Sequence, residues 1–186
     1  MILLVLGAAL VVAAAGVGIA LAFGGGGGES TGGGCVRKTF ADQGRQHVTE
    51  LPKGFKHNSF PATSGPHFAQ PNGPAVWNIY EQPVPELALV HNLEHGGVVV
   101  QYGDQVPSET VRQIADWYAD DPLGLVVAPL PALKAKIALT AWTHLMTCST
   151  FNEDSFSNFR DDFRGKGPEN RGPQGIPLES LQPGTQ

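Results

Sequence analysis

Several kinds of motif are missing from this 186-residue chain, and each absence excludes a kind of chemistry. There is no glycine-rich Walker or dinucleotide-binding motif, and the letters G-x-S-x-G, which in other proteins mark a serine nucleophile, occur only at residues 28–32, within a glycine-rich linker. Lys and Arg are scarce as well, since 12 basic residues stand against 17 acidic ones and the formal net charge is −5. The sequence therefore lacks the basic cluster with which proteins bind nucleic acid or anionic lipid.

Charge is absent altogether from residues 1–23, which are almost entirely apolar. A helix needs roughly 20 apolar residues to cross the hydrocarbon layer of a membrane, whereas a cleaved secretory signal has a basic start and a shorter apolar stretch. The pattern favours an uncleaved transmembrane anchor. A cleaved signal is the alternative, because Ala20–Ala22 is compatible with a cleavage site. We therefore expect a single-pass protein of the cell membrane, with its domain on the extracytoplasmic side.

Composition divides the rest of the chain into three parts. A glycine-rich linker, residues 24–34, precedes residues 35–165, which have the size of one domain. Residues 166–186 are rich in Gly and Pro and are expected to form a flexible tail. The two cysteines, Cys35 and Cys148, lie near the two ends of the predicted domain. In an exported protein such a pair favours a disulfide, and the alternative is that both thiols are free.

The predicted fold class is α+β. Alternating or β-branched apolar runs predict strands, and apolar residues at helical spacing predict two helices. Residues 53–74 are dominated by Pro, Gly, Asn and Ser, which predicts a long loop. The sum is a small mixed or antiparallel sheet with two helices and a long Pro/Gly-rich loop, preceded by the transmembrane helix. Strands are expected within 36–49, 76–80, 98–102, 123–130 and 136–148, and helices after Pro107 and after Asn152 or Asp154.

Candidate ligands are concentrated in the segment VHNLEHGGVVVQY, which contains His91, Glu94 and His95. Residues four apart share a face in a strand as well as in a helix, so His91 and His95 can approach one metal ion. His67 and His47 supply further imidazoles, which suit Cu(II) and Zn(II). Glu94 is then a ligand, or an acceptor that orients one imidazole. We predict a copper or zinc site formed by these five residues.

Two other interpretations of the same residues remain open. The letters H-N-L-E-H match the H-x-x-E-H motif of inverzincin metallopeptidases, so a metal-dependent hydrolase with Glu94 as general base is one alternative. That motif requires a helix, whereas Gly96-Gly97 and three following valines argue for a turn that enters a strand. The other alternative is a structural module whose histidines form a buried hydrogen-bond network. His57 and His144 are interpreted as surface or hydrogen-bonded core residues.

Four segments in this order, GRQHV, FPATSGPH, VHNLEHGGVVVQY and LTAWTHL…FRGKGPE, resemble the bacterial membrane-anchored family catalogued as domain of unknown function 3105. The resemblance covers about residues 35–169 and implies a membrane segment followed by an extracytoplasmic domain. The histidine motifs of the family fall on His47, His67, His91 and His95, with Glu94 beside them. The segment WTHLMTC departs from the usual pattern, which is more basic and contains less sulfur. The resemblance implies no activity, and we predict metal handling or support of an envelope metalloprotein partner.

Overall fold

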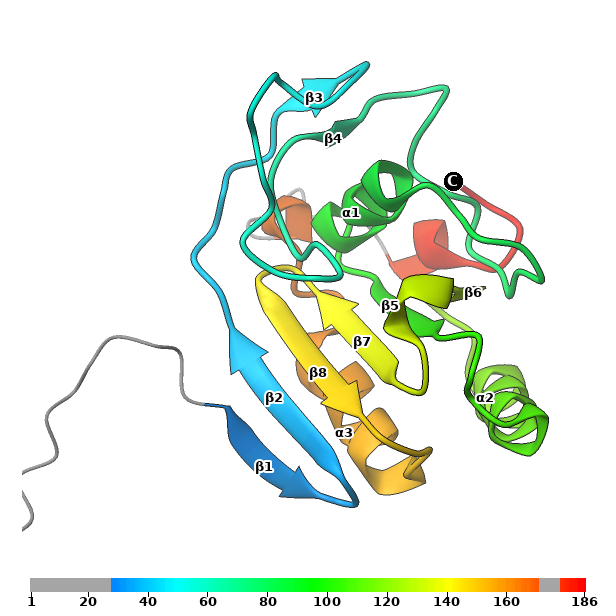
Figure 1. Cartoon of the computed structure of the whole chain (residues 1–186). Helices are drawn as coiled ribbons and strands as arrows, with labels where there is room; N and C mark the ends of the chain where they lie inside the picture. Colours follow the sequence, from blue (N-terminus) through cyan, green and yellow to red (C-terminus); the bar gives the residue numbers. More distant parts are fainter. Residues whose placement is uncertain (1–27, 171–177) are drawn as a thin grey trace, which may run out of the picture.

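The computed structural model describes residues 28–170 and 178–186. Within these residues it is a mixed α+β fold, with a six-stranded sheet and three α-helices (Figure 1). The strand order is β1-β2-β8-β7-β5-β6, and all neighbours are antiparallel except β5 and β6. The strands of this sheet are β1 (Glu29–Gly32), β2 (Cys35–Thr39), β5 (Val98–Tyr102), β6 (Leu125–Pro129), β7 (Ile137–Ala141) and β8 (His144–Cys148). The remaining elements are strands β3 (His47–Val48) and β4 (His67–Phe68), helices α1 (Glu86–Glu94), α2 (Ser108–Asp120) and α3 (Glu153–Phe163), and short 3-10 turns at Pro131–Leu133, Pro168–Asn170 and Leu178–Leu181.

Helices cover both faces of the central strands. Residues Val98 and Val100 of β5 pack in one apolar cluster with Ile114 of α2 and Phe156 of α3. The intervening Val99 belongs to the opposite cluster, with α1 and the long loops. This arrangement explains why β5 is an almost unbroken apolar run, since a strand buried on both faces has no solvent side to carry polar residues. Helix α2 makes the crossover that the parallel pair β5–β6 requires.

The predicted disulfide is confirmed. Cys35 of β2 lies directly opposite Cys148 of β8, with the two Cα atoms 4.1 Å apart and a sequence separation of 113. Both residues are buried in the cluster between the sheet and α3. The bond joins two neighbouring strands and closes most of the domain into one covalent loop.

The segment H-N-L-E-H was predicted to be a turn entering a strand, and this prediction is wrong. Helix α1 continues through Glu94, and His95 forms its C-terminal cap. The chain leaves the helical path at Gly96, whose φ of +80° is readily adopted by glycine. Every residue from Ala88 to Glu94 is buried, so the helix has no polar face and lacks the periodicity by which a helix is recognised. The two predicted helices, which are α2 and α3, therefore become three.

Two predicted strands also differ from the strands in the structure. The segment 136–148 is a hairpin of two strands, because Trp142 and Thr143 turn the chain and Thr143 has a φ of +65°. Residues 76–80 form no strand and contribute a single parallel bridge, from Ile79 to Val127 of β6.

Parts of the expected linker and tail lie against the domain. Strand β1 falls within the glycine-rich linker and pairs with β2. Leu181 is fully buried beside Trp77, and its carbonyl accepts a hydrogen bond from the Gly124 amide. The expected anchor, residues 1–23, lies outside the described residues. In the part of the chain that the structure describes, no helix is long and apolar enough to cross a membrane.

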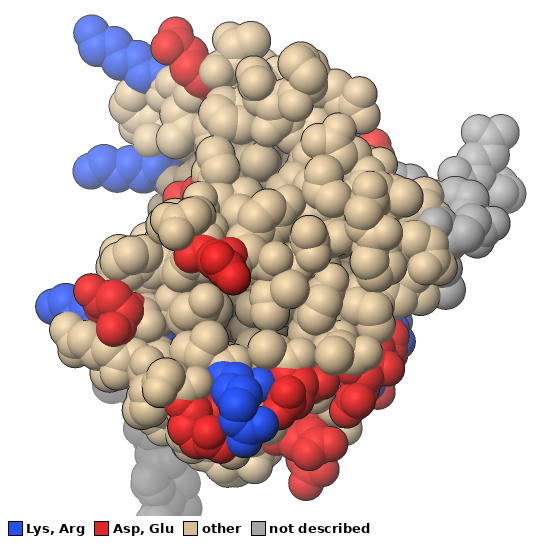
Figure 2. Space-filling model, turned by 90° about the vertical axis from the view of Figure 1, so that its right-hand side faces the viewer, with Lys and Arg blue, Asp and Glu red and all other residues tan. Residues whose placement is uncertain are grey.

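The face of the molecule that carries α2 is mostly uncharged (Figure 2). Acidic side chains gather along its lower edge. On α2 itself, Arg112 is paired with Glu109 and Asp116. Among the described residues drawn in this view, Lys and Arg stand apart from one another at the rim. This face therefore presents no cluster of positive charge.

Gly97 allows Trp77 to fill the space between α1 and β5. Trp77 is fully buried, and a Cβ atom added at Gly97 would overlap the far edge of its ring. We expect Gly97→Ala to lower the free energy of unfolding by about 1 to 3 kcal/mol, as overpacking of a core does, in urea unfolding measurements. The control is the same change in a Trp77→Leu background, where the smaller side chain should remove most of the cost. An equal cost in both backgrounds would contradict this account of the packing.

Candidate metal centre

The pair β3–β4 places His47 beside His67. These two-residue strands are parallel, and His47 is the direct partner of His67. The pairing is continued by the segments before each strand, since the Gly65 amide donates to Gly44 and the His67 amide donates to Gln46. The two rings lie edge to face with their centroids 4.9 Å apart.

Helix α1 supplies the opposite side of the site. His91 and Glu94 are three residues apart and therefore lie on the same face of the helix. Strand β4 packs on this helix, and the carbonyl of Phe68 accepts a 2.6 Å hydrogen bond from Nδ1 of His91. Figure 1 shows β3 and β4 lying over α1, away from the large sheet. The site is thus assembled from three segments that are distant in sequence.

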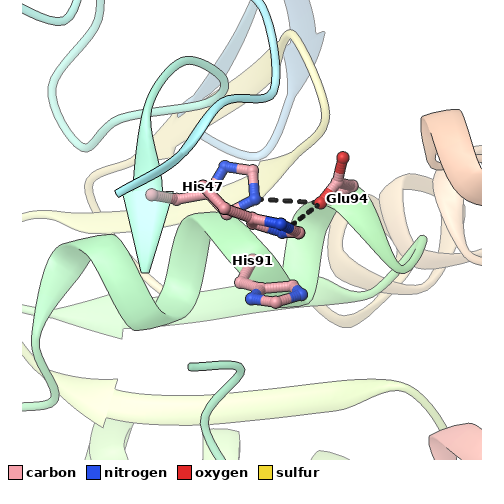
Figure 3. A group of neighbouring side chains, drawn as sticks. His47, His91 and Glu94 are labelled. Carbon is pink, nitrogen blue, oxygen red and sulfur yellow. Dashed lines mark hydrogen bonds and ion pairs between the residues drawn. The ribbon is translucent and has the colours of Figure 1, made fainter. Parts of the chain in front are cut away.

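The four side chains converge on a small volume. One carboxylate oxygen of Glu94, Oε2, lies 2.9 Å from Nε2 of His67 and 3.3 Å from Nε2 of His47 (Figure 3). Together with His91, these residues offer four donor atoms that all lie within 4.8 Å of one another. Donors bound at about 2.0–2.1 Å to one tetrahedral ion lie about 3.3 Å apart. The four residues could therefore hold a metal ion after small side-chain movements.

Three of the four donors are buried. His67 is 0% exposed, His91 5% and Glu94 2%, whereas the side chain of His47 is 45% exposed. The group is therefore shielded from solvent at His67, His91 and Glu94, and it is open to solvent at His47.

The hydrogen bonds of His67 leave a conflict that a cation would resolve. Its Nδ1 lies 2.8 Å from the carbonyl of Gly65, and its Nε2 lies 2.9 Å from Glu94. A neutral imidazole has only one N–H, so it cannot donate to both acceptors. The carbonyl and an ionised carboxylate can both only accept, so one of the two contacts lacks a hydrogen. With the hydrogen on Nδ1, the lone pair of Nε2 faces a carboxylate oxygen. Two lone pairs at this distance need a positive centre between them, either a second proton, on the ring or on the carboxyl group of Glu94, or a metal ion.

The protonation states of the neighbouring groups suit a metal. Burial, the dominant cause, lowers the pKa of His91 to about 4, so this ring is neutral at neutral pH. Burial opposes ionisation of Glu94, but its contact with His67 and the neighbouring imidazoles, which are protonated in acid, outweigh burial, so the pKa of Glu94 is lowered. Metal ligands must be deprotonated, and both groups meet that condition without a loss of protons near neutral pH.

The structure brings together four of the five predicted site residues and places His95 beside them. The ring of His95 lies edge to face on that of His91, with centroids 4.6 Å apart. Its Nε2 is 3.2 Å from Oε2 of Glu169. Burial lowers the pKa of His95, against the opposing effect of the carboxylates of Glu169 and Glu94.

Glu169 is the residue near the site that the prediction left out. It was assigned to the flexible tail, although it lies in the segment FRGKGPE that carries part of the family resemblance. His57 and His144 lie outside the group of four, in agreement with their interpretation. His57 bonds the carbonyl of Ser64, and His144 stacks on Phe163.

The H-x-x-E-H segment meets the helical requirement of the inverzincin motif but uses its residues differently. In that motif the two histidines bind one ion and the glutamate activates water. Here Glu94 contacts His67 and His47 directly, whereas His95 faces Glu169. The geometry gives Glu94 the position of a ligand rather than that of a free general base.

Fold and site together define a small α+β domain with a buried cluster of three histidines and one glutamate. Over residues 48–175 the sequence matches the family described as Protein of unknown function (DUF3105), and the chain belongs to this family. The match begins directly after His47 and includes His67, His91, Glu94 and His95. No curated protein and no solved structure matches the chain.

Proposed function

We propose that this chain is a metal-handling domain of the cell envelope, which binds one copper or zinc ion through His47, His67, His91 and Glu94. The observation that carries the proposal is the pairing of His67 with Glu94 at 2.9 Å in a fully buried position. With the hydrogen on Nδ1 and donated to Gly65, a metal ion between Nε2 and the carboxylate would satisfy both lone pairs. A charged imidazolium there would carry the cost of desolvation.

The hydrogen bonds at Nδ1 of two candidate ligands, His67 and His91, support the same function. In metal sites the ligating imidazole commonly donates its other N–H to a carbonyl or carboxylate, which fixes the tautomer and the ring orientation. His67 does so to Gly65, and His91 does so to Phe68. In each ring the hydrogen bond at Nδ1 fixes the orientation and leaves Nε2 as the nitrogen that could bind a metal ion.

The donor set favours a divalent ion. Imidazole nitrogens with one carboxylate suit Zn(II) and Cu(II), whereas Cu(I) prefers sulfur donors. The sulfur of Cys148 is in a disulfide, and Met146 is buried in the cluster between the sheet and α3. Neither residue belongs to the group of four, so the site offers nitrogen and oxygen only.

An extracytoplasmic location is part of the proposal. Disulfides persist in oxidising compartments, and the bond between Cys35 and Cys148 fits export of the domain. The apolar residues 1–23 would anchor the chain, leaving the site outside the membrane to exchange metal with an envelope metalloprotein.

A structural module is the second candidate, and the hydrogen bonds of His67 favour it. They tie the buried loop before β4 to helix α1 without any need for a metal. This candidate requires a proton, rather than a metal ion, between His67 and Glu94. The two functions therefore differ in what binds at one position.

Metal analysis of the full-length chain, purified without a histidine tag, tests the proposal. After chelation and dialysis, titration with Zn(II) and Cu(II) is expected to show a tight site that is lost in a His67→Ala/His91→Ala variant, with Kd raised at least about 100-fold. His144→Ala is the matched control, because this histidine lies outside the group, and it should leave Kd unchanged. Equal binding by the wild type and the double variant would exclude the site.

A further inference from the structure

Strands β2 and β8 have one face that no described α-helix covers. Side chains alternate along a strand, and the guanidinium of Arg37 in β2 lies over an aromatic ring of α3. Its neighbours Val36 and Lys38 therefore point to the other side of the sheet. They are the direct cross-strand partners of Thr147 and Leu145 in β8. Figure 1 shows α3 behind these two strands and no described α-helix in front of them.

A cavity lies on this uncovered face. Its volume is about 780 Å³, and it is lined by side chains of β2 and β8 and by the loop residues 57–60. This volume is within the range of about 300–1,000 Å³ that is typical of small-molecule sites. None of the lining residues belongs to the group of four, so the cavity is separate from the candidate metal centre.

Hydrogen bonds hold the loop that forms one wall of the cavity. The side chain of Asn58 donates a 2.8 Å hydrogen bond to the carbonyl of Ala41, and the Asn58 amide donates to Oε1 of Gln43. Nδ1 of His57 lies 2.9 Å from the carbonyl of Ser64. The wall is therefore already formed, so a ligand would not have to order this loop in order to bind.

The lining combines exposed apolar side chains with two ammonium groups. Val36 and Phe60 are 39% and 54% exposed, and they are two of the four large apolar side chains that the described residues expose. Lys38 and Lys136 also line the cavity, whereas no Asp or Glu does. Among the residues that the structure describes, no carboxylate forms an ion pair with either lysine. The charge of the lining is therefore purely basic, on a chain whose formal net charge is −5.

We propose that this cavity binds a small organic anion, which has one carboxylate or phosphate group and an apolar body. The two lysines would attract the anionic group, and contact with the apolar side chains would remove the body from water. The net charge of the chain repels anions in general, so the basic lining gives the cavity a local preference for an anionic ligand. Because the group of four takes no part, binding is expected in the metal-free protein as well.

Equilibrium dialysis of the full-length chain in phosphatidylcholine nanodiscs tests this inference, with a chelator present to keep the protein free of metal. The probes are phenylbutyrate, phenylbutyl phosphate and the neutral phenylbutanol, and empty nanodiscs measure the partition of each probe into lipid. At least one anionic probe is expected to bind saturably at one site per chain, at least about tenfold more tightly than the alcohol. The tighter of the two anions identifies carboxylate or phosphate as the group that the cavity prefers.

Substitutions of exposed residues show whether binding occurs in this cavity. Lys38→Gln/Lys136→Gln should raise the Kd of the anionic probe at least about tenfold, and Phe60→Ala should weaken it too. Lys53→Gln/Lys56→Gln is the matched control, because it removes the same charge from exposed residues outside the lining, and it should bind like the wild type. The proposal is overturned if no anionic probe binds saturably, if the alcohol binds as tightly as the anions, or if the two double variants behave alike.

Discussion

Metal is expected to stabilise the wild-type chain by about 2.7 kcal/mol when the free ion is at 100 times its Kd. For a chain of this size that corresponds to a rise in Tm of roughly 5 to 10 °C. The reason is that the ligands come from three separate segments, so an unfolded chain cannot present them together. Thermal unfolding followed by circular dichroism, with Zn(II) or with a chelator, measures the difference.

Variants of His67 separate the metal site from the structural network. His67→Ala should abolish the metal-dependent rise in Tm, whereas the His144→Ala control should keep it. A structural network predicts another pattern, in which the wild type unfolds at the same temperature with metal and with chelator. In that case His67→Ala would lower Tm equally under both conditions, because a buried hydrogen-bonding group is lost either way.

Replacing both cysteines should destabilise the domain by roughly 4 to 5 kcal/mol in the chain-entropy description of disulfides. The bond between Cys35 and Cys148 spans 113 residues, and a long closed loop removes much of the freedom of the unfolded chain. Urea unfolding of Cys35→Ala/Cys148→Ala beside the wild type checks the value. The double substitution avoids a free thiol, which a single substitution would leave.

A simple control distinguishes the effect of the bond from that of the side chains. Both cysteines are buried in the cluster under α3, so their replacement also removes packed sulfur atoms. Wild-type protein reduced with dithiothreitol retains those atoms and should show most of the same loss. If the reduced wild type is as stable as the oxidised protein, the disulfide contributes little.

Sequence patterns predicted the helices that have one buried face and one exposed face. The apolar stripe of α2 and the phenylalanines of α3 mark helices with one buried face, and Asn152 caps α3 through the Ser155 amide. Helix α1 was missed because tertiary packing buries it almost completely, so its composition resembles that of a buried strand. The hairpin at Thr143 was missed because its left-handed backbone lacks a glycine or asparagine to signal it.

The candidate ligands were recognisable by residue type, but their grouping was not. No local pattern indicates that His47 pairs with His67, because a parallel two-residue ladder leaves no periodicity in the sequence. The separation of His95 from the group of four depends on where helix α1 ends, and this helix was not predicted. The approach of Glu169 depends on the docking of a glycine-rich segment whose composition suggested a tail.

The disulfide also has a topological consequence for the site. The group of four lies entirely between Cys35 and Cys148 in sequence, so its residues belong to a closed covalent ring. A single protease cut in a loop of this ring would leave the two pieces bonded to each other. The residues of the group of four would stay in one molecule after such a cut. Glu169 lies beyond Cys148 and could be removed by proteolysis without opening the ring.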